Sequence, residues 1–535
     1  MNASEEFLAS RARGRFICVL AACGVLLIPA VSCGSTPAAA RKPNVVLLLA
    51  DDLGFADVGY HDGEIQTPNI DRLAAAGSRL ERFYAAPICS PTRAALMTGR
   101  DPMELGIAYD QIHPWYNGGL PPGAETLPKA FRQAGYQTAI VGKWHLGHTQ
   151  AHQLPAAHGF DYFHGHLQTN TDYYQHEREG AHDLQENGRP VDMTGRYLTH
   201  IQSEQAVRFL KERDKTRPFL LYLAFTAPHS PMQAPEETRS LYSHLPEKNF
   251  RRTYAAMVHE MDVAIGSVLD TLEAEGLARD TIVLFFSDNG GYYPFGANNA
   301  PLRGQKGQTF EGGIRVPAAL RWPRELAAGG QVEERMTVMD VFPTLASAAG
   351  VAVPDASELD GVDMWPVIRA GAPAPERGAV FFASEIPIPG LIHLAVLDGD
   401  WKLVQIVREG QTETRVRDLL FRIDEDPNEE RDLSGEHPEV VARLAGQIRA
   451  WRSRHPMAGF RGTLVAHPGW VAPYDWAEAV TPGRLLQPEW RNELPFPQAL
   501  LDATRERGVL VDEAARSRLE AEEKVRDAAW ASPQP

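Results

Sequence analysis

The segment Pro87–Gly99 combines a cysteine with residue types that bind an anionic group. Ser90 is a good helix cap and Pro91 fits the first helical position, so we expect Cys89 to lie just before a helix start. Unpaired backbone N–H groups at a helix start form a binding site for sulfate or phosphate. Arg93 would lie in the first turn, where its guanidinium can fork onto oxygens near position 89. The segment therefore predicts an anion site beside a thiol.

Cys89 is also distinguished by having no partner cysteine in the body of the chain. The sequence has four cysteines, and the other three, Cys18, Cys23 and Cys33, lie near the N-terminus. If that leader is removed, the thiol of Cys89 cannot form an internal disulfide. The alternative is a buried thiol that packs as a small apolar side chain, as free cysteines commonly do.

Polar side chains follow directly on several runs of apolar, strand-like sequence. Asp51-Asp52 follow the run 44–50, Lys143-Trp144-His145 follow 138–141, Asp288-Asn289 follow 282–286, and His229 comes shortly after 219–225. In open α/β sheets, ligands bind outside the carboxyl ends of the strands. We therefore expect carboxylates, an amide, a lysine and histidines to meet at one edge of one sheet.

Four of these side chains predict a metal site. Asp51, Asp52, Asp288 and Asn289 offer only oxygen ligands, which suit hard cations such as Ca²⁺ or Mg²⁺. Sites rich in flexible carboxylates favour Ca²⁺ over Mg²⁺. The alternative is that Asp51 and Asp52 merely cap the next turn or helix. The equivalent position of Asp288 and Asn289 behind another strand favours the metal.

Five separated motifs together resemble one enzyme family. Cys-Ser-Pro-Thr-Arg at 89–93, followed by Ala-Ala-Leu-Met-Thr-Gly, resembles the signature of the sulfatases, in which the cysteine is oxidised to formylglycine. The other motifs are Gly142–Gly147, Asp288–Gly291, Arg303–Lys306 and Glu311–Arg315. The resemblance covers residues 44–435, including 424–433. It implies an alkaline-phosphatase-like fold and the hydrolysis of sulfate esters.

Within the sulfatases, three stretches are most similar to the N-acetylgalactosamine-4-sulfatase type, also called arylsulfatase B. These stretches are 111–115, 159–177 and 228–237. The disulfide cysteines of that type are absent here, and Arg315-Val316-Pro317 is the more common bacterial form. We therefore expect a sulfated sugar or aryl compound as the substrate, without a more specific assignment.

The resemblance also implies a mechanism and a ligand set. The aldehyde at position 89 would be hydrated to a geminal diol, and one diol oxygen, activated by the metal, would attack sulfur and displace the alcohol. Deprotonation of the second hydroxyl would then expel sulfate and restore the aldehyde. The attacking oxygen places Cys89, as formylglycine, with Asp51, Asp52, Asp288 and Asn289 around the metal.

The resemblance assigns roles to five further side chains. Arg93 and Lys143 would lie beside the formylglycine oxygens, and His145 would be the base for collapse of the sulfated intermediate. Lys306 and His229 would lie at the leaving oxygen, where one or both donate the proton. The alternatives are a loop histidine without a task at 229 and a solvated surface lysine at 306. Four loop residues are candidates for sugar contacts, with an ordinary loop role as the alternative: Tyr173, Tyr174, Asn298 and Asn299.

The elements that must position these residues alternate between strand and helix patterns. Helix patterns occur from Thr67-Pro68 towards Gly77, at 125–133, 202–211 and 254–275, between the strand-like runs. This alternation predicts an α/β fold with a large, doubly wound, mostly parallel sheet. From about residue 380 the pattern changes to short strands at 394–397 and 401–407 and a helix at 439–452. We therefore expect a catalytic domain at 43–380, a smaller α+β domain at 381–455 and an extension of unknown role at 456–535.

The N-terminus predicts export. Three arginines precede the apolar run 17–31, which is shorter than a membrane-spanning helix. Small residues then lead to Cys33, which resembles a bacterial lipoprotein box, so 1–33 is interpreted as a lipoprotein-type signal and 34–42 as a linker. Ordinary cleavage after 38–40 is the alternative. We expect a periplasmic or outer-membrane-anchored protein, attached to the membrane only through a lipid on Cys33.

The formal charge of −16 argues against general binding of nucleic acids, which requires lysine and arginine to neutralise phosphates. The expected partners are a sulfated small molecule or glycan and a formylglycine-generating or radical maturation enzyme. Two other functions stay open. One is hydrolysis of phosphate or phosphonate esters on a similar fold, and the other is glycan binding without catalysis by a lipoprotein with an unconverted cysteine.

Overall fold

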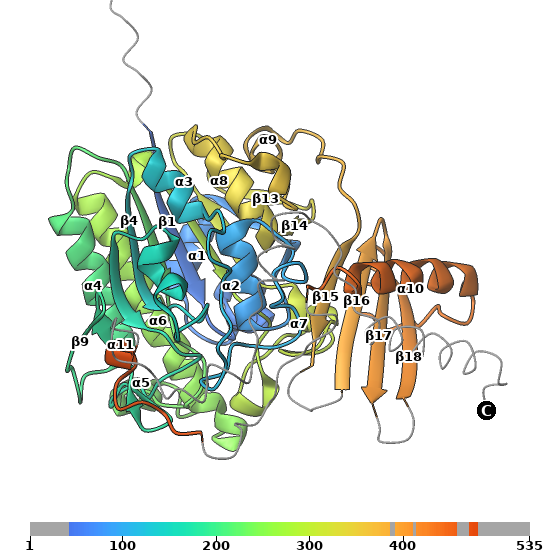
Figure 1. Cartoon of the computed structure of the whole chain (residues 1–535), viewed down its shortest axis with the longest axis horizontal. Coiled ribbons are helices and arrows are strands. Elements are labelled where there is room, and N and C mark those ends of the chain that lie inside the picture. Colours follow the sequence, from blue (N-terminus) through green and yellow to red (C-terminus); the bar gives the residue numbers. More distant parts are fainter. Residues whose placement is uncertain (1–41, 386–390, 410–413, 457–469, 480–535) are drawn as a thin grey trace, which may run out of the picture. The chain divides into compact units, whose positions relative to one another are not determined.

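The computed structural model of the protein describes residues 42–385, 391–409, 414–456 and 470–479 (Figure 1). The predicted signal with Cys33, and most of the predicted extension 456–535, lie outside these residues. The largest element is a ten-stranded sheet. Its strands, in spatial order, are β13 (Gly330–Val332), β2 (Ser78–Leu80), β12 (Ala318–Arg321), β11 (Thr281–Ser287), β1 (Asn44–Ala50), β10 (Phe219–Ala224), β4 (Gln137–Lys143), β5 (Tyr162–His166), β8 (Gln185–Glu186) and β9 (Arg189–Pro190).

The centre of this sheet is parallel and its strands end level with one another. β1 pairs in parallel with β10 on one side and with β11 on the other, and β10 pairs in parallel with β4. Ala50 lies opposite Ser287, and Ala224 lies opposite Gly142. The residues that follow these strands therefore leave the sheet at the same edge.

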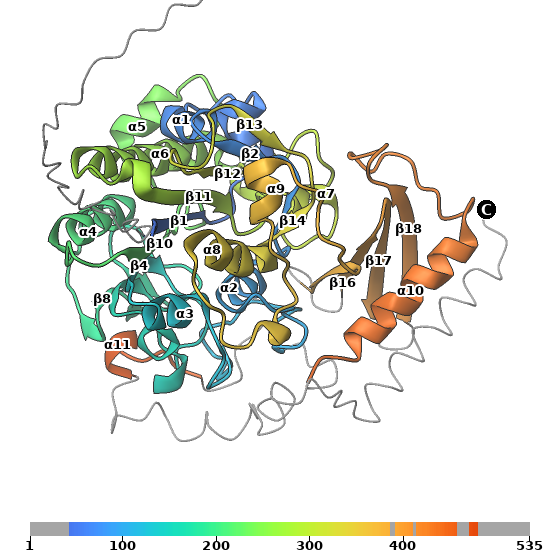
Figure 2. The ribbon, with the colours of Figure 1, turned by 90° about the horizontal axis from the view of Figure 1, so that it is seen from above.

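Helices cover both faces of the sheet because the side chains of β1 alternate between two apolar cores. Val45, Leu47 and Leu49 pack in one core, whereas Val46, Leu48 and Ala50 pack in the other. The first core includes α2 (Cys89–Thr98), α3 (Leu127–Gln133), α8 (Val341–Ala349) and α9 (Trp365–Ala370). The second includes α1 (Pro68–Ala75), α4 (Leu198–Glu212) and α6 (Arg251–Ala274). Figure 2 shows the two layers, which confirm the doubly wound α/β prediction.

A four-stranded antiparallel sheet follows and confirms the predicted smaller α+β part. Its strands are β15 (Val380–Ser384), β16 (Leu391–Asp398), β17 (Trp401–Glu409) and β18 (Thr414–Arg422), in that spatial order. Helix α10 (Pro438–Arg452) packs on one face through side chains such as Leu444 and Ile448. The other face packs on Phe310 and Ile314 of the larger part.

Predicted helix starts differ from the observed ones by up to four residues, the largest difference being at α4, which begins at Leu198 and not at 202. Helix α2 begins at Cys89 itself, and the side chain of Ser90 does not cap it. Ser90 is buried, and its hydroxyl instead contacts the backbone of Ile112 and His145. Helix α3 begins at Leu127, not at 125, because Thr126 accepts the capping hydrogen bond.

Among the described residues, no helix is both long and apolar enough to cross a membrane.

Candidate active site

Two carboxylates leave the end of β1 in a conformation that brings both into the site. Asp52 has φ of 68°, a left-handed conformation that is rare for non-glycine residues. Its backbone N–H donates to Asp288 Oδ1 at 3.2 Å, and Asn289 Nδ2 donates to Asp52 Oδ1 at 2.8 Å. The ends of β1 and β11 are thus joined by side chains, as the level strand ends predict.

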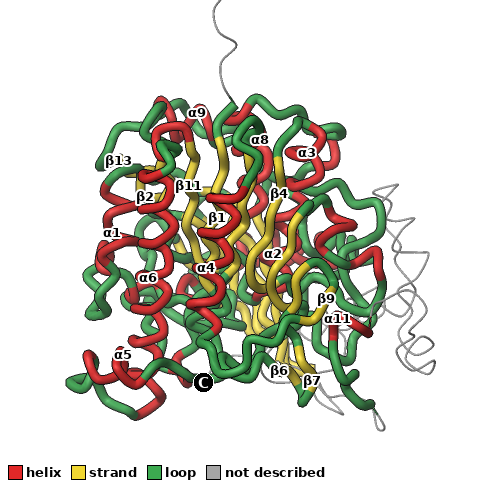
Figure 3. Tube along the Cα trace, turned by 90° about the vertical axis from the view of Figure 1, so that its left-hand side faces the viewer, coloured by secondary structure: helices red, strands yellow, loops and turns green. Residues whose placement is uncertain are grey.

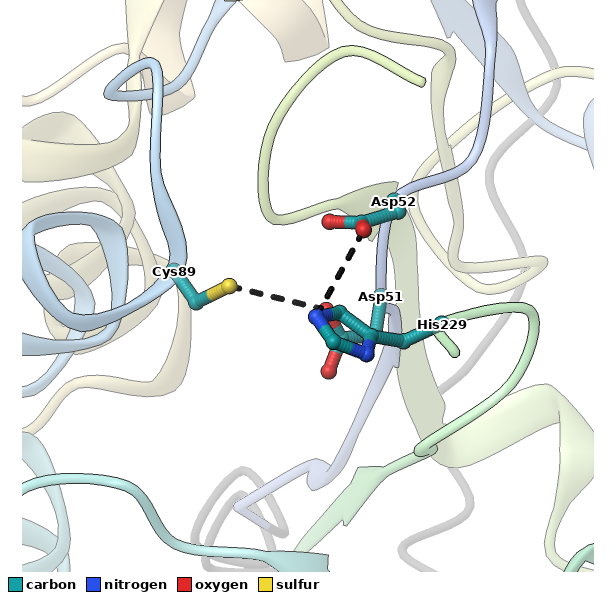
Figure 4. A group of neighbouring side chains, drawn as sticks. All are labelled: Asp51, Asp52, Cys89 and His229. Carbon is teal, nitrogen blue, oxygen red and sulfur yellow. Dashed lines mark hydrogen bonds and ion pairs between the residues drawn. The ribbon is translucent and has the colours of Figure 1, made fainter. Parts of the chain in front are cut away.

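Cys89 lies across from these carboxylates at the start of α2. Its side chain is fully buried, and Sγ is 3.6 Å from Asp51 Oδ1. Figure 4 shows Sγ pointing towards Asp51 and His229, which come from two other segments. Burial, with Asp288 next in effect, raises the pKa of the Cys89 thiol, so the unmodified thiol is a poor nucleophile.

Three buried cations pair with the three carboxylates of the site. Lys143 Nζ is 2.5 Å from Asp51 Oδ2, and Lys306 Nζ is 2.7 Å from Asp52 Oδ1. Arg93 donates through Nη2 to Asp288 at 2.8 Å and to Asp51 at 3.5 Å. These six groups balance to a formal charge of zero, so one divalent cation would give the site a charge of about +2, favourable for an anionic ester.

His145 is positioned as a neutral base. Its Nε2 lies 3.1 Å from the carbonyl oxygen of Ile112, and because a carbonyl only accepts, Nε2 carries the hydrogen. The other nitrogen, Nδ1, is buried and has no hydrogen-bond partner in the described structure. Burial, reinforced by the charges of Lys143 and Arg93, holds the pKa of His145 well below its usual value. The lone pair of Nδ1 is therefore available to take a proton.

His229 lies beside Asp52 and Lys306. Its Nε2 is 3.6 Å from Asp52 Oδ2, and its Nδ1 is 2.8 Å from the carbonyl oxygen of Ser230. Burial, with Lys306 next in effect, holds the pKa of His229 well below its usual value. Burial lowers the pKa of Lys306, but the combined effects of Asp52, Cys89 and Asp51 outweigh it and raise the lysine pKa, so Lys306 is protonated.

The oxygen groups at the strand ends fit a hard cation. Asn289 Oδ1 is buried without a hydrogen-bond partner in the described structure, so this acceptor is available to a ligand. Side-chain atoms of Asp51, Asp52, Cys89 and His229 also lie within 4.8 Å of one another. The site thus offers an oxygen set with Asn289 and, if the thiol is retained, a mixed set with sulfur and nitrogen.

Several residues that support the site carried no local signal in the sequence. The hydroxyl of Tyr222 lies 3.4 Å from Arg93 Nη1, and the hydroxyl of Tyr254 donates to the carbonyl oxygen of Asp52. Of the loop residues weighed as sugar contacts, two are fully buried. The hydroxyl of Tyr173 donates to the carbonyl oxygen of His229, and Asn299 bonds the backbone of Gly291. Tyr173 and Asn299 therefore support the site from within the fold.

The comparisons with known proteins agree with this geometry. The family model described as Sulfatase matches residues 43–351, and one described as N-sulphoglucosamine sulphohydrolase, C-terminal, matches residues 305–454. Arylsulfatase J of Mus musculus is 39% identical over 345 residues, which are 63% of this chain and 58% of that protein. N-acetylgalactosamine-6-sulfatase of Homo sapiens is 35% identical over 460 residues, covering 77% of this chain and 86% of that protein.

Solved structures show the same architecture. The crystal structure of Ps i-CgsB in complex with k-i-k-neocarrahexaose has a TM-score of 0.71 and 31% identity, covering 81% of this chain and 95% of that one. A doubly wound sheet with carboxylates, cations and a helix-start cysteine at its carboxyl edge defines an ester hydrolase for anionic groups. The chain belongs to the sulfatase family, as the five motifs predict. The finer similarity to the 4-sulfatase type stays a prediction, because the two relatives named above are an arylsulfatase J and a 6-sulfatase.

Proposed function

We propose that the protein hydrolyses sulfate esters of a sulfated saccharide or aryl compound, with Cys89 converted to formylglycine and Ca²⁺ bound beside it. The observation that carries the proposal is the position of Cys89, whose Sγ faces Asp51 among three buried cations. A thiol with a raised pKa is inert there, which supports the need for conversion by a separate maturation enzyme.

The converted residue and the metal supply the chemistry that the side chains lack. As formylglycine, residue 89 supplies a hydrated aldehyde, whose hydroxyl oxygen is the nucleophile towards sulfur. Asp51, Asp52, Asp288 and Asn289 would hold Ca²⁺, which would supply Lewis-acid polarisation and positive charge.

The side chains of this chain bind the sulfate group and move protons. Arg93 and Lys143 are fixed cations that stabilise negative charge developing on the sulfate oxygens. His145 takes a proton from the residue 89 hydroxyl through the free lone pair of Nδ1. Lys306, which is protonated in the free site, donates a proton to the leaving alcohol oxygen, with His229 beside it to orient that oxygen.

The names of the relatives support a substrate class. One similar structure is a complex with a neocarrahexaose, and curated relatives are named for N-acetylgalactosamine sulfate and steryl sulfate. These names support a sulfated glycan or small molecule as the substrate of this chain. We propose further that the protein is exported and anchored through a lipid on Cys33, for which the pattern of the leader is the support.

The site weighs against a non-catalytic glycan-binding protein. Three cations and three carboxylates are buried together, which costs free energy of folding. Such clusters are typical of catalytic sites. A phosphate or phosphonate ester hydrolase remains the competing enzyme, because the two ester groups have similar shape and charge.

Removal of the metal tests the proposed site. Chelation should lower sulfate release from para-nitrophenyl sulfate by about 100-fold or more, since a bound Lewis acid supplies several kcal/mol of transition-state stabilisation. Ca²⁺ should restore activity at least as well as Mg²⁺. Restoration only by Zn²⁺ would contradict the oxygen set and favour the Cys89 and His229 set.

A matched pair of variants locates the metal. Asn289→Ala should raise the Ca²⁺ concentration needed for half-restoration by at least about tenfold. Asn298→Ala removes the same amide from a nearby loop, where Asn298 Oδ1 accepts only the N–H of Ala300. The control variant should respond to Ca²⁺ like the unaltered protein.

A further inference from the structure

A short segment of the C-terminal extension, residues 470–479, packs against the larger part of the protein. It contains α11 (Trp476–Ala479), which lies beside β9 (Figure 3). Both matching family models end at or before residue 454, so this segment lies outside the family's matched regions. We call residues 470–479 the strap.

The strap is anchored by a buried aromatic ring and an ion pair. Trp476 is fully buried, and its ring lies edge-to-face on His148 at 5.1 Å. Asp475 Oδ2 lies 2.6 Å from His182 Nδ1, while Asp475 Oδ1 accepts the N–H groups of Ala477 and Glu478. One carboxylate thus caps α11 and binds the strap to the hairpin of β6 (Glu177–Arg178) and β7 (Ala181–His182).

The strap contacts a loop that holds the proposed base. The ring of Trp470 lies edge-to-face on Trp115 at 5.9 Å between centroids. Trp115 in turn stacks on His113 at 4.7 Å, with nearly parallel planes. In the same loop, Ile112 contacts both Ser90 and the Nε2 of His145. Trp115 is therefore only three residues along the chain from Ile112, which contacts the site directly.

The strap also presents apolar side chains to solvent. Tyr474 is 92% exposed and Val471 is 60% exposed, although the ring of Trp476 two residues further along is fully buried. An anchored segment that leaves an aromatic ring in water is typical of a binding surface. Aromatic faces bind the apolar faces of sugar rings, whereas the small sulfate group is bound by the charged site.

We propose that the strap, with Trp115, forms a subsite for sugar units next to the sulfated residue of an oligosaccharide. This inference rests on the proposed sulfatase function. The strap would then determine preference for oligosaccharides over small sulfate esters without touching the reacting atoms.

The test measures binding and turnover separately, in the full chain. The probe is whichever of three sulfated hexasaccharides, from carrageenan, chondroitin sulfate or heparan sulfate, the protein binds most tightly by calorimetry. Trp470→Ala should weaken binding by about tenfold, because loss of an aromatic contact costs about 1 kcal/mol or more. Tyr474→Ala should weaken it by about threefold. The kcat/KM for para-nitrophenyl sulfate should stay within about twofold in both.

Two further variants keep the result interpretable. Asp475→Ala, which removes both the cap and the ion pair, should weaken hexasaccharide binding like Trp470→Ala. Leu241→Ala, which truncates a side chain that is 59% exposed on α5 (Glu236–Leu241), should change nothing. Equal losses on both substrates, unchanged affinity, or no binding of any hexasaccharide would overturn the subsite. Binding without sulfate release would contradict the sulfatase function alone.

Discussion

Replacing Cys89 with serine is expected to lower sulfate-ester turnover by about 10⁴-fold or more, as losses of a covalent nucleophile commonly do. A serine hydroxyl can attack sulfur, but it lacks the second hydroxyl whose deprotonation expels sulfate. Cys89→Ala lacks a nucleophile altogether and should lose as much. Turnover is measured as sulfate released from para-nitrophenyl sulfate. Peptide mass spectrometry first confirms that the unaltered protein contains formylglycine at position 89.

Folding controls separate lost chemistry from lost structure. Cys89→Ser changes one buried atom, so the free energy of unfolding should change by about 1 kcal/mol. Thr98→Ser lies on the same helix, where the Thr98 hydroxyl donates to the carbonyl oxygen of Ala94. That variant should keep its turnover. A Cys89→Ser protein that is folded and nearly as active as the unaltered one would remove residue 89 from the reaction.

The second large effect concerns stability at the contact between the two sheets. Lys402 of β17 is fully buried, and its Nζ lies 2.8 Å from both Glu311 Oε1 and Glu429 Oε1. Glu311 also accepts the hydroxyl of Tyr84, and Glu429 accepts the N–H of Glu311. One lysine therefore compensates two buried carboxylates, one of them in the loop after β18.

Lys402→Met is expected to lower the free energy of unfolding by about 3–5 kcal/mol, the usual cost of leaving buried charge uncompensated. Urea unfolding followed by tryptophan fluorescence measures this change. Lys215→Met is the matched control, because Lys215 pairs with Glu275 at the surface and its side chain is 64% exposed. That substitution should cost about 0–1 kcal/mol. Equal costs for the two variants would show that the buried cluster adds nothing.

The destabilisation should also depend on pH. Burial raises the pKa of Glu429 to about 7; Lys402 opposes this rise with the next largest effect, and Glu311 adds to it. A carboxyl group with a raised folded-state pKa favours the folded state below its unfolded value of 4.5, and this advantage is lost as pH rises through the folded value. Removing Lys402 raises the folded pKa further. The loss in stability should therefore be greater at pH 8 than at pH 5.

The sequence alone was sufficient to predict the central sheet and the edge at which the candidate metal ligands meet. The unbroken apolar run 44–50 predicts a strand covered on both faces, and the structure places it at the centre of the sheet. Because β1 and β11 are parallel neighbours, the carboxylates that follow them had to meet. The pairing of Asp52 with Asp288 and Asn289 is therefore a consequence of topology that alternation already indicates.

Features that depend on contacts between distant loops could not be predicted. Ser90 was expected to cap its own helix, but tertiary contacts with Ile112 and His145 decide its position. The hydrogen position of His145 depends on the same carbonyl group of Ile112, which lies 33 residues away in the sequence. Lys306 follows no strand end, so only the family resemblance could assign it to the site.

The position of the strap could not be predicted from the sequence either. Residues 470–479 have no helical or strand periodicity, and their position depends on the pairing of Asp475 with His182, 293 residues away in the sequence. A tryptophan in an irregular tail gives no indication of its partner. Such contacts can be found only in three dimensions.

The most direct test of the enzyme described here compares two matched substrates. The kcat/KM of metal-loaded, formylglycine-containing protein is measured for para-nitrophenyl sulfate and for para-nitrophenyl phosphate under identical conditions. We expect the sulfate ester to react faster, because the chain belongs to the sulfatase family and its five motifs match that family. Faster hydrolysis of the phosphate ester would contradict the assignment and make the protein a phosphatase on a sulfatase fold.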